Sequence, residues 1–247
     1  MRAGEAAMAG ALITVPAFAG RRDGVRHFFG TRHEPRDVGS LASDDESVRC
    51  VVSVTQVHGT DALVLDRPVR DGETFAGGWD ALLTNQAGVA LTIRTADCLP
   101  MLVHDPVRHV VAALHVGWRG AVAGIVSKTL SLLHHRFGSM PESFQIGIGP
   151  SVGPCCYEVD EPVLSRLRAG FRDWRSVVEE TGPNKAMLDL HALVRRQAQA
   201  AGVDGERIQS VRVCTACHPD LFYSYRREGT VKGTMISGIV LTRRRSR

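Results

Sequence analysis

The sequence predicts an α/β (α+β) fold in a single domain, with mixed β-sheets flanked by helices. Short apolar or alternating runs fill the first half of the chain and are bounded by Gly, Asp and Pro, which is typical of closely spaced strands. After Gly120 the apolar residues change to helical spacing. Strand-like runs return near the end of the 247-residue chain, and 44% hydrophobic residues suffice for one large core.

The expected strands are runs of apolar or β-branched residues that end at turn-forming residues. Seven precede Gly120, at 25–29, 50–54, 62–65, 81–84, 89–93, 100–103 and 110–114. Four more follow, at 144–148, 208–213, 222–225 and 235–241.

The clearest helix follows Gly120, because apolar side chains recur there at helical spacing and Gly138 provides a stop. The recurring residues are Val122, Ile125, Val126, Thr129 and Leu133. Two further helices are expected at 162–167 and 190–201.

Domain boundaries follow from these elements. Residues 1–23 are expected to form an N-terminal extension or first strand that is partly flexible, residues 24–242 the single functional domain, and residues 243–247 a basic tail. The apolar stretch 6–20 imitates a signal peptide, but Glu5 and Pro16 argue against export. We therefore expect a cytoplasmic protein with reduced thiols.

Composition argues against two classes of partner. The net charge is +4, much of it from the Arg-rich tail, and aromatic residues make up only 6% of the chain, so a nucleic-acid partner is not expected. No apolar run approaches the ~20 residues that span a bilayer, so no membrane partner is expected either. A monomer or homodimer is expected.

Metal-capable side chains follow three of the expected strands. His58 stands in Gln-Val-His-Gly, Cys98 in Ala-Asp-Cys, and His115 in His-Val-Gly-Trp-Arg-Gly. Two imidazoles and a thiolate suit zinc, and three protein ligands leave a fourth coordination position open. Copper would also accept these donors. Taken singly, each residue is more often a hydrogen-bonded core histidine or a buried thiol than a metal ligand.

The segment CTACH, residues 214–218, has the C-x-x-C-H form of a c-type haem attachment site. A reduced, cytoplasmic protein leaves a half metal site, a redox pair or plain buried thiols as alternatives, and buried thiols are favoured. The vicinal Cys155-Cys156 cannot complete the usual pair of C-x-x-C motifs of a zinc ribbon.

Specific motifs resemble a family described as laccase-like polyphenol oxidases or purine nucleoside phosphorylases. The resemblance covers about residues 24–241 and includes QVHGTDALV, GVALTIRTADCLPMLVHD, VAALHVGWRGAVAGIV, IGPSVGPCCYEV and VCTACHPDLFYSYRREG. It implies that His58, Cys98 and His115 bind zinc, that the fold is similar to that of bacterial toxin deamidases with a catalytic cysteine, and that no haem is attached.

The resemblance implies a purine nucleoside phosphorylase with adenosine deaminase activity, acting with phosphate on adenosine, inosine, guanosine or methylthioadenosine. Laccase-like polyphenol oxidase activity is disfavoured, because the chain has no H-x-H pair for multiple copper centres. A hydrolase that edits cell-wall precursors and a non-catalytic metal-binding protein remain alternatives.

Candidate site residues surround these motifs. Asp97, Cys98 and Arg119 are the catalytic candidates: Asp97 orients a ligand or carries a proton, and Arg119 clamps phosphate near a helix start. Arg32 and Gln56 are substrate-binding candidates. Cys155 joins them by fold analogy as a nucleophile candidate. For each, an ordinary surface Arg, turn Asp or buried Cys is the alternative.

Two further segments bear on these expectations. The basic pair Arg226-Arg227 is interpreted as solvated charge. Segment 37–45 lacks the Asn and the Asn-Arg pair that family members carry, which predicts an altered specificity or rate.

Overall fold

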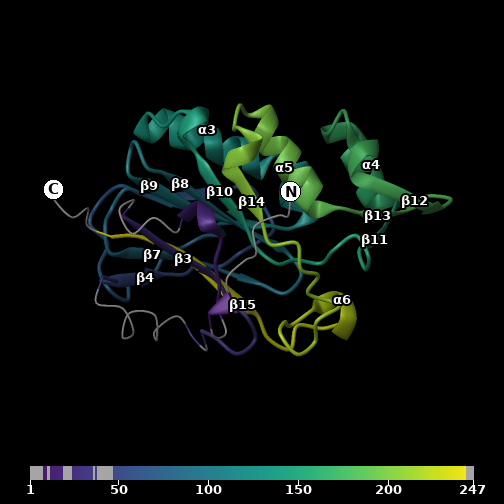
Figure 1. Cartoon of the computed structure of the whole chain (residues 1–247), viewed down its shortest axis with the longest axis horizontal. Coiled ribbons are helices and arrows are strands. Elements are labelled where there is room, and N and C mark those ends of the chain that lie inside the picture. Colours follow the sequence, from purple (N-terminus) through teal and green to yellow (C-terminus); the bar gives the residue numbers. More distant parts are fainter. Residues whose placement is uncertain (1–7, 10–11, 19–23, 36, 38–46, 243–247) are drawn as a thin grey trace.

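Two six-stranded sheets and a layer of helices stack on one another, which confirms the predicted fold class (Figure 1). The computed structural model describes residues 8–9, 12–18, 24–35, 37 and 47–242. The basic tail, residues 19–23 and nearly all of segment 37–45 lie outside this range.

The first sheet has the order β1-β2-β3-β15-β7-β4. Its neighbours are antiparallel except for β4 and β7, which run parallel. Its strands are β1 (Met8–Ala9), β2 (Leu12–Ile13), β3 (Val25–Phe29), β4 (Cys50–Val52), β7 (Val89–Thr95) and β15 (Met235–Leu241).

The second sheet has the order β14-β10-β8-β9-β6-β5, and mixes parallel and antiparallel pairs. Its strands are β5 (Ala62–Leu65), β6 (Ala81–Thr84), β8 (Leu99–Asp105), β9 (Val110–Val116), β10 (Gln145–Ile148) and β14 (Ile208–Ser210). A small antiparallel sheet is added by β11 (Glu158–Asp160), β13 (Lys185–Leu188) and β12 (Val178–Gly182).

The helices lie mainly over the second sheet (Figure 1). The α-helices are α2 (Trp118–Val122), α3 (Ile125–Phe137), α4 (Glu161–Gly170), α5 (Leu190–Ala200) and α6 (Tyr225–Glu228). Short 3-10 turns are η1 (Pro16–Phe18), η2 (Pro141–Ser143), η3 (Trp174–Val177) and η4 (Gly205–Arg207). No helix among the described residues is both long enough and apolar enough to cross a membrane.

The second sheet separates two cores, because its strands are apolar on both faces. Leu82 and Leu102 face the first sheet, while their neighbours Leu83 and Met101 face the helices. Since successive side chains of a strand point to opposite faces, a continuous apolar run is what a middle layer requires. The sheet is therefore buried on both sides and rigid enough to hold side chains at its strand ends.

Most of the predicted elements are confirmed, although several begin or end at other residues than predicted. Predicted strands 25–29, 62–65, 81–84 and 235–241 match β3, β5, β6 and β15. The prediction of a strand at 222–225 is wrong. Phe222 is fully buried, and Ser224 starts α6 instead, where its side chain accepts a hydrogen bond from the Arg227 N–H. Strands β11 to β13 were not predicted.

The described part of the N-terminal stretch packs against the folded core. Phe18 is buried, its ring lies against Gly147 of β10, and the Ala17 N–H donates to the Gln209 side chain at 2.7 Å. A Cβ on Gly147 would lie 2.8 Å from the Phe18 ring, so this close approach requires glycine.

Candidate metal centre

His58, Cys98 and His115 come together where β8 begins and β9 ends, at the strand ends of the second sheet. One ligand atom from each of the three lies within 4.8 Å of the others. Residues Leu99 of β8 and Val116 of β9 are direct partners in the antiparallel register, which places Cys98 beside the end of β9. His58 comes from the loop after β4. The three side chains thus converge although they are distant in sequence.

His115 differs from expectation, because it lies within β9 rather than in the loop that follows. It is buried, and its backbone N–H donates to the Asp80 carbonyl at 2.8 Å. Its ring meets that of His58 edge to face, with the two centroids 4.8 Å apart. The strand therefore fixes one imidazole while a loop supplies the other.

Asp80, which sequence reasoning missed, holds both histidines. Its carboxylate is buried and lies 2.7 Å from Nδ1 of His115. The same carboxylate accepts hydrogen bonds from the backbone N–H groups of Val57, His58 and Gly59, the last at 2.6 Å. Because Nδ1 of His115 is engaged, its Nε2 is the nitrogen left for a metal. The only sign of it in the sequence is an acid directly before a short, fully buried strand, β6.

Gln56 anchors the loop that carries His58. Its side-chain amide donates to the Arg94 carbonyl and accepts from the Arg94 N–H, both at 2.8 Å. His58 itself has a φ of 59°, a left-handed conformation that the loop must hold in place. Both polar groups of Gln56 are therefore engaged with β7, whereas a contact with substrate was expected.

The electrostatics of the cluster favour a thiolate beside a cationic or metal-bound imidazole. Burial would raise the pKa of Cys98, but hydrogen bonds with His115 and His58 outweigh it and place the pKa at about 7. Burial would lower the pKa of His115, but hydrogen bonds with Asp80 and Cys98 raise it to about 9. The cluster is thus a site that stabilises an anionic sulfur.

The donor set and the space around it fit a zinc ion. A Cβ on Gly117 would lie 3.0 Å from the His58 ring and 3.1 Å from Sγ of Cys98, so glycine leaves the cluster unobstructed there. Two imidazoles and one thiolate are ligands that zinc accepts with one position open. The same donors also accept copper.

Asp97 braces the loop that carries Cys98. Its φ is 88°, its carboxylate is buried, and its two oxygens accept hydrogen bonds from the Thr215 hydroxyl and the Arg226 N–H, each at 2.5 Å. Its carbonyl accepts from the Val152 N–H at 3.0 Å. The loop of Cys98 is therefore tied to the distant segment 215–226.

Two arginines and a tyrosine lie near the cluster. The Arg119 guanidinium is exposed and stacks 4.6 Å from the Trp118 ring, and the Arg226 guanidinium lies 5.2 Å from the Tyr157 ring. Burial, followed by the charge of Cys98, raises the pKa of Tyr157, while Arg226 and Arg119 act to lower it. Sequence reasoning missed Tyr157.

The interpretation of Arg226-Arg227 as solvated charge is wrong for Arg227, which is half-buried, whereas Arg226 is exposed. Arg226 donates to the Glu158 carbonyl at 2.8 Å. Arg227 donates to the carbonyls of Thr215 and Phe222, both at 2.9 Å. These contacts secure the segment that braces Asp97.

Arg32 and Cys155 lie outside the group formed by His58, Cys98 and His115. Arg32 donates to the Pro219 carbonyl and stacks 4.8 Å from the Tyr223 ring. Sγ of Cys155 lies 3.5 Å from Sγ of Cys217, and both residues are exposed. The expectation that Cys155 and Cys217 are buried thiols is therefore wrong.

Comparison with known proteins agrees with the motifs. A family model described as multi-copper polyphenol oxidoreductase laccase matches residues 38–242. A protein named purine nucleoside phosphorylase YlmD, from Geobacillus stearothermophilus, is 36% identical over 198 residues, which cover 76% of this chain and 71% of that protein. A protein named adenosine deaminase RL5, from an unknown prokaryotic organism, is 34% identical over 195 residues, covering 76% of this chain and 74% of its own length.

The fold is also shared with a solved structure. The crystal structure of YlmD from Geobacillus stearothermophilus superimposes with a TM-score of 0.84 at 30% identity, covering 96% of this chain and 98% of that one. Sequence motifs, family model and fold therefore agree. The chain belongs to the family described as multi-copper polyphenol oxidoreductase laccase, and its relatives include proteins named purine nucleoside phosphorylase.

Proposed function

We propose that the protein is a zinc-dependent purine nucleoside phosphorylase that also deaminates adenosine. The observation that carries this proposal is the convergence of His58, Cys98 and His115, whose ligand atoms lie within 4.8 Å of one another. The names of two relatives, a purine nucleoside phosphorylase and an adenosine deaminase, indicate the substrate class. Adenosine, inosine, guanosine and methylthioadenosine, together with phosphate, are the substrates to test.

A zinc ion held by these three residues supplies a Lewis acid with one open coordination position. In phosphorolysis, a phosphate oxygen attacks C1′ of the ribose while the bond from C1′ to the base breaks and the base leaves with a proton. In deamination, water adds at C6 of adenine and ammonia leaves. Both reactions require a positioned oxygen nucleophile beside a polarised substrate.

The residues around the ligands have distinct tasks in this proposal. Arg119 is exposed and binds the phosphate, since a guanidinium matches the geometry of phosphate oxygens. Asp97 is a positioning residue, because both of its carboxylate oxygens already accept hydrogen bonds from Thr215 and Arg226. Tyr157, with its raised pKa, stays protonated and presents a neutral hydroxyl near Cys98.

Laccase chemistry finds less support in the ligands present. Reduction of dioxygen by four electrons requires several copper centres rich in histidine. Within the described residues, two clusters have three or more metal-capable side chains. One is the group of His58, Cys98 and His115, and the other consists of cysteines alone. A single site with an open position fits hydrolytic or phosphorolytic chemistry better.

The deciding experiment incubates the reduced, zinc-loaded protein with adenosine, with and without phosphate, and separates the products by chromatography. Adenine should form only with phosphate, and inosine should form without it. Cys98→Ser and His58→Ala should abolish both. His135→Ala is the matched control, because His135 is exposed on α3 and belongs to neither cluster.

Two other outcomes separate the alternatives. Faster cleavage of a mis-incorporated muropeptide precursor than of any nucleoside would favour a cell-wall editing hydrolase. Protein that carries zinc at His58, Cys98 and His115 yet turns over neither class would be a non-catalytic metal-binding protein.

A further inference from the structure

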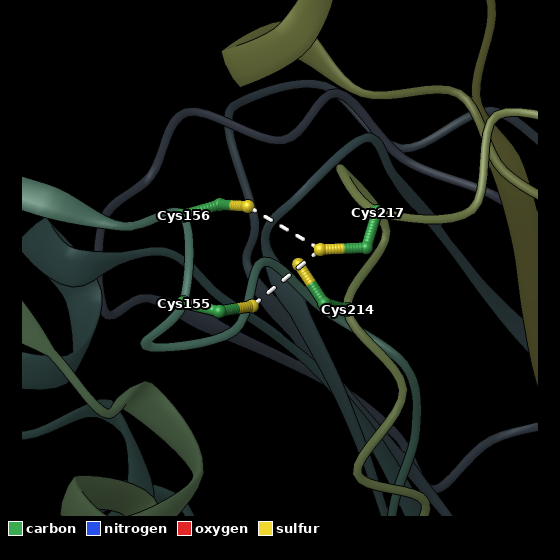
Figure 2. A group of neighbouring side chains, drawn as sticks. All are labelled: Cys155, Cys156, Cys214 and Cys217. Carbon is green, nitrogen blue, oxygen red and sulfur yellow. Dashed lines mark hydrogen bonds between the residues drawn. The ribbon is translucent and has the colours of Figure 1, made fainter.

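Four of the six cysteines gather at a second place in the fold. Cys155 and Cys156 come from the turn before β11, and Cys214 and Cys217 come from the turn after β14. Figure 2 shows the four sulfurs pointing toward a common centre from these two segments. Sequence spacing excluded only the usual zinc ribbon of two C-x-x-C motifs, and the fold brings the vicinal pair and the C-x-x-C pair together.

The spacing of the sulfurs is that of a tetrahedral thiolate site. Sγ of Cys217 lies 3.5 Å from Sγ of Cys155 and 3.4 Å from Sγ of Cys156, and all four sulfurs lie within 4.8 Å of one another. Zinc at about 2.3 Å from four sulfurs sets neighbouring sulfurs about 3.8 Å apart. All four cysteines are free thiols, so no disulfide accounts for their proximity.

The backbone favours the anionic form of one of the four sulfurs, that of Cys214. Burial and hydrogen bonds with neighbouring thiols instead raise the pKa of Cys155 to about 11 and raise that of Cys156. The Gly153 N–H donates to Sγ of Cys214 at 3.2 Å. Partial burial would raise the pKa of Cys214, but N–H groups of Gly153 and Cys217 outweigh it and lower the pKa. A Cβ on Gly153 would lie 3.1 Å from Cβ of Cys214, so glycine permits this close approach.

Both turns are held independently of any ion. The Thr215 N–H donates to the Ser151 carbonyl at 3.0 Å, which ties the C-x-x-C turn to the segment before Cys155. Arg227 donates to the carbonyls of Thr215 and Ala216, which holds the turn between Cys214 and Cys217. Four sulfurs are thus positioned before a ligand binds, which lowers the cost of binding one.

We infer that Cys155, Cys156, Cys214 and Cys217 form a second metal site that binds one zinc ion through four thiolates. The site has no open position, so its task is structural. It clamps the turn whose Thr215 hydroxyl holds Asp97, the residue before Cys98. Binding releases the thiol protons, because zinc is ligated by thiolates.

The test counts metal in protein that has been reduced, loaded with zinc and desalted. Wild type should retain two equivalents, Cys98→Ser one, and the double variant Cys155→Ser/Cys217→Ser one. The matched control is Cys50→Ala, which should retain two, because Cys50 is a buried cysteine of β4 outside both clusters. One equivalent in wild type with none in Cys98→Ser would overturn the inference.

A second measurement does not depend on the folding of the double variant. Cys98→Ser loaded with Co²⁺ should show strong sulfur-to-metal charge-transfer bands and a tetrahedral visible spectrum. Chelation of this variant should lower its Tm by about 5–10 °C, the size expected for a ligand well above its Kd in a protein of this length. A spectrum without such bands, or full reactivity of all four thiols with Ellman's reagent in excess zinc, contradicts the site.

These readouts concern the four cysteines alone, since the Cys98→Ser background has lost the other thiolate ligand. Loss of nucleoside turnover would instead report on His58, Cys98 and His115. The two proposals can therefore fail separately.

Discussion

Nδ1 of His115 lies 2.7 Å from Oδ1 of Asp80, and both side chains are almost fully buried. Burial would raise the pKa of Asp80, yet hydrogen bonds from His115 and Gly59 outweigh it and lower the pKa. The same carboxylate also accepts hydrogen bonds from the N–H groups of the His58 loop, so one residue orients two of the three candidate metal ligands.

Replacing this carboxylate should weaken metal binding. Asp80→Asn places an amide N–H₂ against backbone donors and the His115 ring, so zinc affinity should fall about 10- to 100-fold. Competition with a chromophoric chelator measures the Kd. Asp61→Asn is the control, because Asp61 is an exposed acid directly before β5, as Asp80 is directly before the neighbouring strand β6. Equal affinities in wild type and Asp80→Asn would show that the carboxylate does not orient the ligands.

Removal of the Arg119 guanidinium should weaken phosphate binding. Because a charge-assisted hydrogen bond contributes about 1.5–3 kcal/mol, Arg119→Ala should raise the KM for phosphate about 10- to 100-fold. The matched control is Arg175→Ala, whose guanidinium stacks 4.5 Å from the Trp174 ring, as that of Arg119 stacks on Trp118. A loss confined to kcat, with KM for phosphate unchanged, would rule out this phosphate contact.

The bond between Thr215 and Asp97 should contribute to stability. Thr215 is fully buried, and Thr215→Val removes the hydroxyl that donates a hydrogen bond to Oδ1 of Asp97. Because this buried oxygen then lacks its donor, the free energy of unfolding should fall by about 1–3 kcal/mol. Thr129→Val is the contrasting variant. Within the described residues, the buried Thr129 hydroxyl has no hydrogen-bond partner, so its removal should cost little. Urea titrations measure both, and equal losses would contradict the prediction.

The protein should lose stability in mild acid through His27. Burial lowers the pKa of His27 from 6.5 to about 4, and its Nε2 accepts a hydrogen bond from the Val15 N–H, which requires the neutral ring. Since the unfolded chain binds the proton first, the stabilisation is complete above the unfolded pKa and is lost as pH falls from 6.5 toward 4.

His27→Gln keeps a hydrogen-bond acceptor without a titrating ring. The free energy of unfolding should therefore fall by about 1–3 kcal/mol less on acidification in this variant than in the wild type. Unfolding at neutral pH and near pH 5 measures the difference. His33→Gln serves as the control, because His33 is exposed. A slope unchanged in His27→Gln would assign the acid sensitivity to other groups.

Much of the sheet structure was predictable because its strands are apolar on both faces. Strands β6, β8 and β9 are fully buried, and apolar residues dominate their sequences, with Thr84, His104, Asp105 and His115 as the polar exceptions. By contrast β12 is mostly exposed and polar, and it is held by its pairing with β13 and its contacts with η3. Segment 222–225 is apolar for another reason, since Phe222 anchors a loop in the core.

The candidate ligands were named from strand ends and motifs, but their partners were not. An acid before a strand, as at Asp80, has the same appearance whether it faces water or a histidine. The register of β6 on β9 pairs Ala81 with Leu114 and so sets Asp80 beside His115. Likewise no spacing rule pairs Cys155-Cys156 with Cys214 and Cys217.

The sequence by itself determined most of the buried strands and which side chains have the chemistry to bind zinc, because burial pattern and donor type are local properties. Only the tertiary structure decided which donors share an ion, which carboxylate orients them, and that four distant cysteines meet. These are distances between segments, and strand register and loop anchoring set them after the chain folds.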